Sequence, residues 1–119
     1  MKTLFVAALT AFAATAAPAV ADARAASGAE IRAAIAGNTV QGSMVDASDY
    51  TEFYAANGTI RGDGYTGSWH IEDNRMCFRY GNGAADCYGV RLDGNRVIWL
   101  KNGQTDGTGT IVTGNPSDF

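Results

Sequence analysis

One histidine is the most obvious candidate for chemistry in this sequence. His70 is the only histidine, and Ser68 lies two residues before it. No Gly-x-Ser-x-Gly or comparable nucleophile motif accompanies the two residues, as serine chemistry would require. We therefore predict no catalytic residue and no enzyme, and we interpret His70 as a polar residue on a strand. Carboxylates gathered around His70 in one cleft would instead indicate an enzyme.

Acidic residues stand mainly in predicted turns, where an Asp side chain bonds to its own backbone. The run Asp93-Gly94-Asn95 lacks the later ligands of a calcium loop. We therefore predict no metal site and no cofactor. The acidic residues concerned are Asp63, Glu72, Asp73, Asp86, Asp93 and Asp106.

Residues 1–21 have the pattern of a secretory signal peptide. Lys2 supplies a positive start, an apolar run extends from Leu4 to Ala17, and Ala19-Val20-Ala21 fits the small-x-small cleavage rule. The apolar run is shorter than the roughly 20 residues that span a bilayer. We expect a periplasmic or secreted bacterial protein with no membrane span after cleavage.

Length and net charge limit the number of domains and the kinds of partner that this protein can have. A chain of 119 residues suits one small domain, which we place at 22–119 after the signal peptide at 1–21. The sequence has 9 Lys and Arg against 12 Asp and Glu, a formal net charge of −3. Because nucleic-acid binding requires a basic face, we predict no nucleic-acid partner.

The two cysteines, Cys77 and Cys87, are close in sequence. An even number of cysteines in a small exported domain favours a disulfide. A metal site would require Cys-x-x-Cys spacing or more ligands, and only His70 is available. We therefore predict a Cys77–Cys87 disulfide.

A short helix is predicted directly before the first strand. Ser27 followed by Glu30 forms a capping-box pattern, in which each side chain bonds the other's backbone amide. Ile31 and Ile35 lie on one helical face. We predict a helix over 28–36 that packs through this face, plugging one end of the sheet structure or lying across a gap in it.

Beyond the helix, short runs rich in β-branched and aromatic residues alternate with turns. Asn57-Gly58 and Asn82-Gly83 are pairs typical of tight hairpins. Because the connections are too short for parallel crossovers, we predict an all-β fold, an antiparallel meander that closes into a small barrel. A half-open barrel or a sandwich is the alternative. The predicted strands span 39–45, 50–56, 59–62, 65–71, 75–80, 86–92, 96–101 and 108–113.

Alternation along the strands predicts how the cysteines pair. Placing Cys77 opposite Cys87 sets Met76 against Tyr88, so that the apolar side chains of both strands share one face. Three arginines lie with the disulfide on the opposite face: Arg75, Arg79 and Arg91. They are a possible binding patch for an anion or for a partner's carboxylates. The alternative is a solvated strand face.

Aromatic side chains are numerous enough to fill a barrel. In a barrel of this length we expect them to form the core, and Trp69 to be a buried structural residue. They would line a ligand cavity only if the barrel had unusual interior room. The residues concerned are Tyr65, Trp69, Phe78, Tyr80, Tyr88 and Trp99.

Motifs spread over nearly the whole predicted domain follow a recognisable order. They are Gly37-Asn38-Thr39, Tyr50 to Tyr54, Asn57-Gly58-Thr59-Ile60-Arg61-Gly62, Gly67-Ser68-Trp69-His70-Ile71, Met76-Cys77-Phe78-Arg79-Tyr80, Cys87-Tyr88-Gly89-Val90 and Gly114-Asn115-Pro116. The chain resembles a family of small exported proteobacterial proteins of unknown function, which implies a fold and a compartment but no activity. Gly67-x-Trp69 is also similar to an element of lipocalin-like barrels, although here it lies in the middle of the chain.

We expect a non-enzymatic binding module whose partner is a small apolar molecule or an envelope protein. The alternative is an inhibitor of an extracellular or periplasmic hydrolase, because a small disulfide-linked barrel is rigid. A dry cavity would favour the first function, and a protruding rigid loop with an exposed anchor residue would favour the second.

Overall fold

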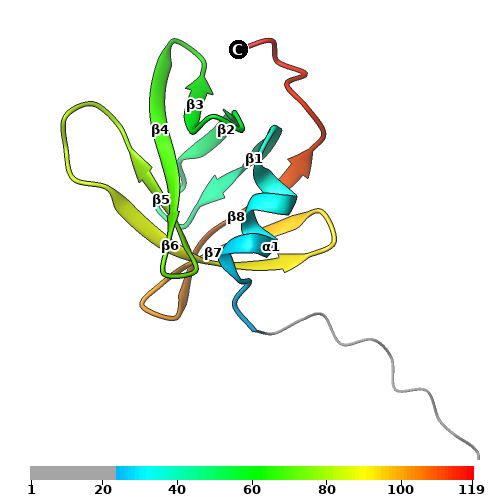
Figure 1. Ribbon diagram of the computed structural model, residues 1–119, viewed down its shortest axis with the longest axis vertical. Helices are drawn as coiled ribbons and strands as arrows, with labels where there is room; N and C mark the ends of the chain where they lie inside the picture. The colour runs from blue at the N-terminus through cyan, green and yellow to red at the C-terminus, as the bar shows by residue number, and fades with distance from the viewer. Residues whose placement is uncertain (1–23) are drawn as a thin grey trace, which may run out of the picture.

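The computed structural model describes residues 24–119, so the predicted signal peptide at 1–21 lies outside the described residues. One helix, α1 (Gly28–Ile35), precedes eight strands (Figure 1). The strands are β1 (Asn38–Met44), β2 (Asp49–Tyr54), β3 (Thr59–Gly62), β4 (Tyr65–Glu72), β5 (Arg75–Arg79), β6 (Asp86–Asp93), β7 (Arg96–Lys101) and β8 (Gln104–Val112). No helix within residues 24–119 has the length and apolar character that crossing a membrane requires.

The strands form a closed antiparallel barrel. Each strand pairs with its neighbour in sequence, and β1 also pairs with β8. The predicted meander and its closure are confirmed, and the half-open barrel and the sandwich are wrong. Closure pairs both edge strands, which removes the open edges that would invite aggregation. The interior is filled mainly by buried apolar side chains, among them Val40, Ile60, Trp69, Met76, Phe78, Val90, Val97 and Trp99.

The last strand begins earlier than predicted. β8 starts at Gln104, whereas its predicted start is at 108. The polar run at 104–106 has no apolar residue, so it carries no strand pattern of its own. It becomes a strand because the tight turn at Asn102-Gly103, with positive φ at both residues, returns the chain directly onto β7.

Helix α1 packs at the end of the barrel where β1 begins and β4 turns into β5 (Figure 1). The predicted capping box is present: Ser27 Oγ accepts from the Glu30 amide, and the Glu30 carboxylate accepts from the Ser27 amide. Ile31 and Ile35 are fully buried, as the helical face predicts. The helix ends at Ile35, one residue before the predicted end.

The cysteines form the predicted disulfide in the predicted register. Cys77 lies opposite Cys87, and Met76 lies opposite Tyr88. One detail of the prediction is wrong, because Cys77 is fully buried rather than on an open polar face. Cys77 stands in β5 between β4 and β6, where His70 and Cys87 are its neighbours across the sheet and cover it.

We expect the Cys77→Ser, Cys87→Ser double variant to lose about 2.5–3 kcal/mol of unfolding free energy, because the short loop is no longer closed in the unfolded chain. Urea unfolding of the variant, of the wild type and of the reduced wild type measures the loss. The reduced wild type should match the variant. Two free thiols in the denatured, unreduced wild type would contradict the expectation.

Candidate functional site

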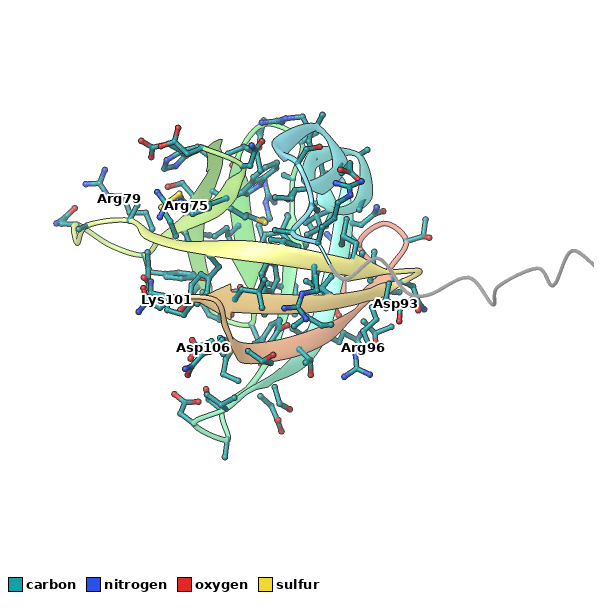
Figure 2. All side chains as sticks on the ribbon, turned by 90° about the horizontal axis from the view of Figure 1, so that it is seen from below. Arg75, Arg79, Asp93, Arg96, Lys101 and Asp106 are labelled. Carbon is teal, nitrogen blue, oxygen red and sulfur yellow. A yellow bond between two sulfur atoms is a disulfide. The ribbon has the colours of Figure 1, made fainter. Side chains whose placement is uncertain are left out.

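A pocket of about 250 Å³ opens at the end of the barrel opposite α1. β1 starts beside the helix and ends at this mouth, where β2, β6 and β8 begin and β5 and β7 end. Figure 2 shows the two ends of the barrel, with Lys101 and Asp106 at the end where β7 stops and β8 starts, and with Asp93 and Arg96 at the opposite end. The pocket is lined by Met44, Tyr50, Glu52, Phe78, Tyr80, Asp86, Tyr88 and Trp99.

One polar group of this pocket is a buried carboxylate. In β2, Tyr50, Glu52 and Tyr54 alternate onto the inner face of the sheet. Glu52 is 6% exposed, and it is the one charged side chain of residues 24–119 that is buried. Glu52 is not among the residues predicted from the sequence. Its position between two tyrosines of one strand face was the available sign that it points inward.

Three tyrosine hydroxyls surround Glu52. Tyr54 donates to Oε1 at 2.8 Å, and Tyr65 donates to Oε2 at 2.8 Å. The Tyr80 hydroxyl lies 2.8 Å from both oxygens. The donors come from β2, from β4 and from the residue directly after β5, so the carboxylate connects strands on different sides of the mouth.

These tyrosines are held in the protonated form. Burial raises the pKa of Tyr54, Tyr65 and Tyr80 above its ordinary value, and the charge and hydrogen bonds of Glu52 raise it further. Each hydroxyl therefore keeps its proton and donates it. Glu52 accepts a hydrogen bond from each of these three hydroxyls.

A second set of hydrogen bonds fixes the other side of the pocket. Trp99 Nε1 donates to the Tyr50 hydroxyl at 2.8 Å, and Tyr50 donates to the Thr108 carbonyl at 3.0 Å. At the rim, Tyr88 donates to Asp86 at 3.0 Å. The N–H or O–H group of each of these rings therefore already donates a hydrogen bond to another group of the protein.

Lys101 completes the rim. Its ammonium pairs with Asp86, and it lies 4.6 Å from the centre of the Tyr88 ring. The hydrogen bond from Lys101 holds the pKa of Asp86 below its ordinary value. A carboxylate and an aromatic face thus already hold one cation at this end of the barrel.

Aromatic rings form the apolar wall of the pocket. The Phe78 ring centre lies 5.3 Å from that of Trp99 and 5.7 Å from that of Tyr88, both in edge-to-face contact. Such packing is favourable beyond simple burial. The wall is therefore a packed aromatic surface in which each ring contacts its neighbours.

The predicted aromatic residues divide between the pocket and the core. Phe78, Tyr80, Tyr88 and Trp99 line the pocket. Trp69 is buried at 4% exposure, as predicted, and its Nε1 donates to the Ala55 carbonyl. Tyr65 and Tyr80 are 42% and 46% exposed. For these two the expected core position is wrong, because they stand at the mouth, where much of each ring is open to solvent.

The three predicted patch arginines differ in their surroundings. Arg75 and Arg79 are exposed on the outer side of β5 (Figure 2), whereas Arg91 in β6 is half-buried. The Arg91 Nε is buried without a hydrogen-bond partner in the described chain. None of the ion pairs found within residues 24–119 involves these arginines. Their use as a binding patch stays a prediction.

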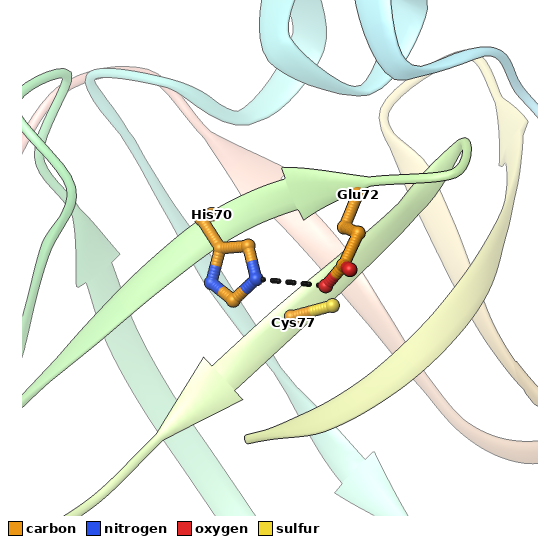
Figure 3. A group of neighbouring side chains, drawn as sticks. All are labelled: His70, Glu72 and Cys77. Atoms are coloured by element: carbon orange, nitrogen blue, oxygen red, sulfur yellow. Dashed lines mark hydrogen bonds and ion pairs between the residues drawn. The ribbon is translucent and has the colours of Figure 1, made fainter. Parts of the chain in front are cut away.

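His70 lies on the outer face of β4 and is not among the residues that line the pocket. Its Nε2 pairs with Glu72 at 3.3 Å, and both side chains are exposed (Figure 3). Cys77 approaches the same two side chains. Because the Cys77 sulfur is bonded to Cys87, it offers no thiolate, and two ligands are too few for a structural metal site.

Comparisons of this chain with family models, with curated proteins and with solved structures found no match. The resemblance to the exported proteobacterial family therefore stays a prediction. The structure itself defines the class of protein. It is a closed eight-stranded antiparallel barrel, with a helix at one end and an aromatic pocket that contains carboxylates at the other.

Proposed function

We propose that this protein is an exported, non-enzymatic binding module that holds a small molecule in the mouth of its barrel. The observation that carries the proposal is the pocket itself, a concave site of about 250 Å³ lined mainly by rings, with a few fixed polar groups. That composition is usual for small-molecule sites. Pockets that bind drug-sized ligands have volumes of roughly 300–1,000 Å³, so the ligand expected here is smaller than drug-sized.

The rigidity of the site supports binding. The disulfide joins β5 to β6, the two strands whose ends contribute Phe78, Asp86 and Tyr88 to the wall. Hydrogen bonds hold Tyr50 and Trp99, and the Trp99 ring packs against Phe78 of that wall. A site that is ordered before its ligand arrives loses less entropy when the ligand binds.

The two carboxylates of the pocket are poorly suited to acid catalysis. Glycoside hydrolysis needs one carboxyl that donates a proton. Asp86 is ion-paired with Lys101, which favours its ionised form, and Glu52 accepts from three hydroxyls. The pocket lining has no serine, cysteine, histidine or lysine to act as a nucleophile or base. This chemistry favours binding over reaction.

Export is supported by two independent features. The predicted signal peptide directs the chain out of the cytoplasm. The Cys77–Cys87 disulfide is of a kind that persists in oxidising compartments. We therefore place the proposed binding activity in the periplasm or outside the cell.

A hydrolase inhibitor remains the second candidate because of one side chain. Val45 is 67% exposed in the turn between β1 and β2, where Asp46 accepts a hydrogen bond from the Ser48 amide. A rigid turn with an exposed apolar anchor is what an inhibitor would present to a hydrolase.

The pocket is tested by filling it. Met44 lines the mouth, whereas its neighbour Val45 points into solvent. In a fragment screen by ligand-observed NMR, we expect hits of the wild type to bind at least about tenfold more weakly to Met44→Trp, because the indole occupies the cavity. Val45→Trp should bind them normally. Equal binding by Met44→Trp, or a wild type without hits, would contradict the proposal.

A further inference from the structure

The pocket offers no free hydrogen-bond donor among its lining side chains. Trp99 Nε1 is bonded to Tyr50, and the hydroxyls of Tyr50, Tyr80 and Tyr88 are bonded to Thr108, Glu52 and Asp86 respectively. Met44 and Phe78 carry no donor. The polar groups that remain for a ligand are the two carboxylates, which accept hydrogen bonds and carry negative charge.

The charge of Glu52 has no counter-charge in the described chain. The ion pairs found within residues 24–119 join Arg24 to Glu30, His70 to Glu72 and Lys101 to Asp86, and none of them includes Glu52. The three tyrosine hydroxyls supply hydrogen bonds but no positive charge. An ionised group buried without an opposite charge is costly, and a cation that enters beside it is correspondingly favoured.

The geometry of the hydroxyls leaves room for one more donor. A carboxylate has about four acceptor sites, and three tyrosine hydrogens are available to fill them. The Tyr80 hydroxyl lies at 2.8 Å from both oxygens but has a single hydrogen. One acceptor site of Glu52 is therefore open to a ligand that donates.

The walls suit a cation as well as an apolar body. Rings of Tyr, Trp and Phe attract a positive charge that lies over their faces. The rim shows this within the protein, since the Lys101 ammonium lies over Tyr88 and pairs with Asp86. The pocket lining contains the same combination, since Glu52 lines it together with the rings of Tyr80, Phe78 and Trp99.

We propose that the ligand of this pocket is a small organic cation, a protonated amine or alkylated ammonium, whose nitrogen lies against Glu52 while its apolar part packs on the aromatic wall. This inference rests on the proposed function and specifies its ligand class. An anionic ligand would meet Glu52 and Asp86, and the cation at the rim, Lys101, is already paired with Asp86. A neutral apolar ligand would fill the pocket but would place no positive charge beside Glu52.

Matched sets of probes test the charge separately from the shape. Benzylamine, benzyl alcohol and benzoate share a ring and differ in charge. Choline and 3,3-dimethylbutan-1-ol share a branched head and differ in charge. Calorimetric titration uses the protein purified after expression of the full chain. We expect each cation to bind at least about tenfold more tightly than its neutral counterpart, and benzoate not to bind.

Glu52→Gln removes the charge with little change of shape, and Glu72→Gln removes an exposed carboxylate outside the pocket as the control. We expect the cation preference to fall to less than about threefold in Glu52→Gln and to persist in Glu72→Gln. Circular dichroism shows whether each variant is folded. If Glu52→Gln does not fold, the ranking of the probes by the wild type still decides the question.

Each outcome has one meaning. Equal binding of cations and neutral counterparts to the wild type, lost in Met44→Trp, would overturn the ligand class and leave the binding function intact. Preference for benzoate would also overturn the ligand class. Cation preference that persists in a folded Glu52→Gln would show that another site binds the cation. Absence of binding by all probes, together with no hits in the fragment screen, would overturn the proposed function itself.

Discussion

Alkaline titration of the folded protein is expected to produce no tyrosinate until the barrel unfolds. The sequence has five tyrosines, and the pKa of each is raised above the ordinary value of about 10. Burial is the largest cause in every case, and neighbouring carboxylates add to it. Native tyrosines therefore stay neutral at a pH where those of the unfolded chain lose their protons.

The direction of the stability change follows from this difference. Above about pH 10 the unfolded state binds fewer protons than the folded state, so stability falls as pH rises. A fully buried group such as Tyr54 contributes about 1.4 kcal/mol per pH unit. Tyr65 and Tyr80 contribute less, because solvent screens them. The contribution of these groups is complete below pH 10 and is lost progressively above it.

Ultraviolet absorbance of tyrosinate, followed together with near-ultraviolet circular dichroism, measures the effect. We expect both signals to change in one cooperative step above pH 10. Tyr88→Phe is a suitable control: its step should be smaller by one tyrosine and should lie at higher pH. Two or more tyrosinates forming near pH 10 in a protein with an unchanged dichroism spectrum would contradict the expectation.

Trp69→Ala is expected to lower the free energy of unfolding by about 3–5 kcal/mol. Trp69 is 4% exposed, its Nε1 donates to the Ala55 carbonyl at 2.9 Å, and the Arg32 guanidinium lies 5.0 Å from its ring. The ring thus joins β4, the turn after β2 and α1. Its removal leaves a cavity and takes one of two hydrogen bonds from the Ala55 carbonyl, which keeps the one from the Gly58 amide. The loss is large against a typical total of about 5–15 kcal/mol.

Urea unfolding of Trp69→Ala is compared with that of Arg32→Ala. The control removes the cation from the ring while the ring itself stays, so we expect it to cost only about 0.5–1 kcal/mol. In a Trp99→Phe background, the remaining emission should be that of an indole shielded from water. A water-exposed emission of Trp69, or a loss below about 1 kcal/mol for Trp69→Ala, would show that the residue is not structural.

Local features of the sequence determined much of the architecture. Ser27 and Glu30 predicted the start of α1 because a capping box needs only neighbouring residues. Turn residues and alternation predicted the order and direction of the strands, since hairpins form between segments adjacent in sequence. The register of Cys77 and Cys87 was predictable because both belong to one hairpin, where alternation leaves few choices.

The tertiary structure alone decided the pocket. Alternation with Tyr50 and Tyr54 indicates that Glu52 points inward, but a carboxylate is held there only by hydroxyls that Tyr65 and Tyr80 bring from elsewhere in the barrel. Closure depends likewise on the pairing of β1 with β8, which lie far apart in sequence. The alternation of residues along a strand indicates which face of the strand is apolar. It does not indicate which hydrogen-bond donors from distant strands meet at the mouth of the barrel, because their positions depend on how all eight strands close together.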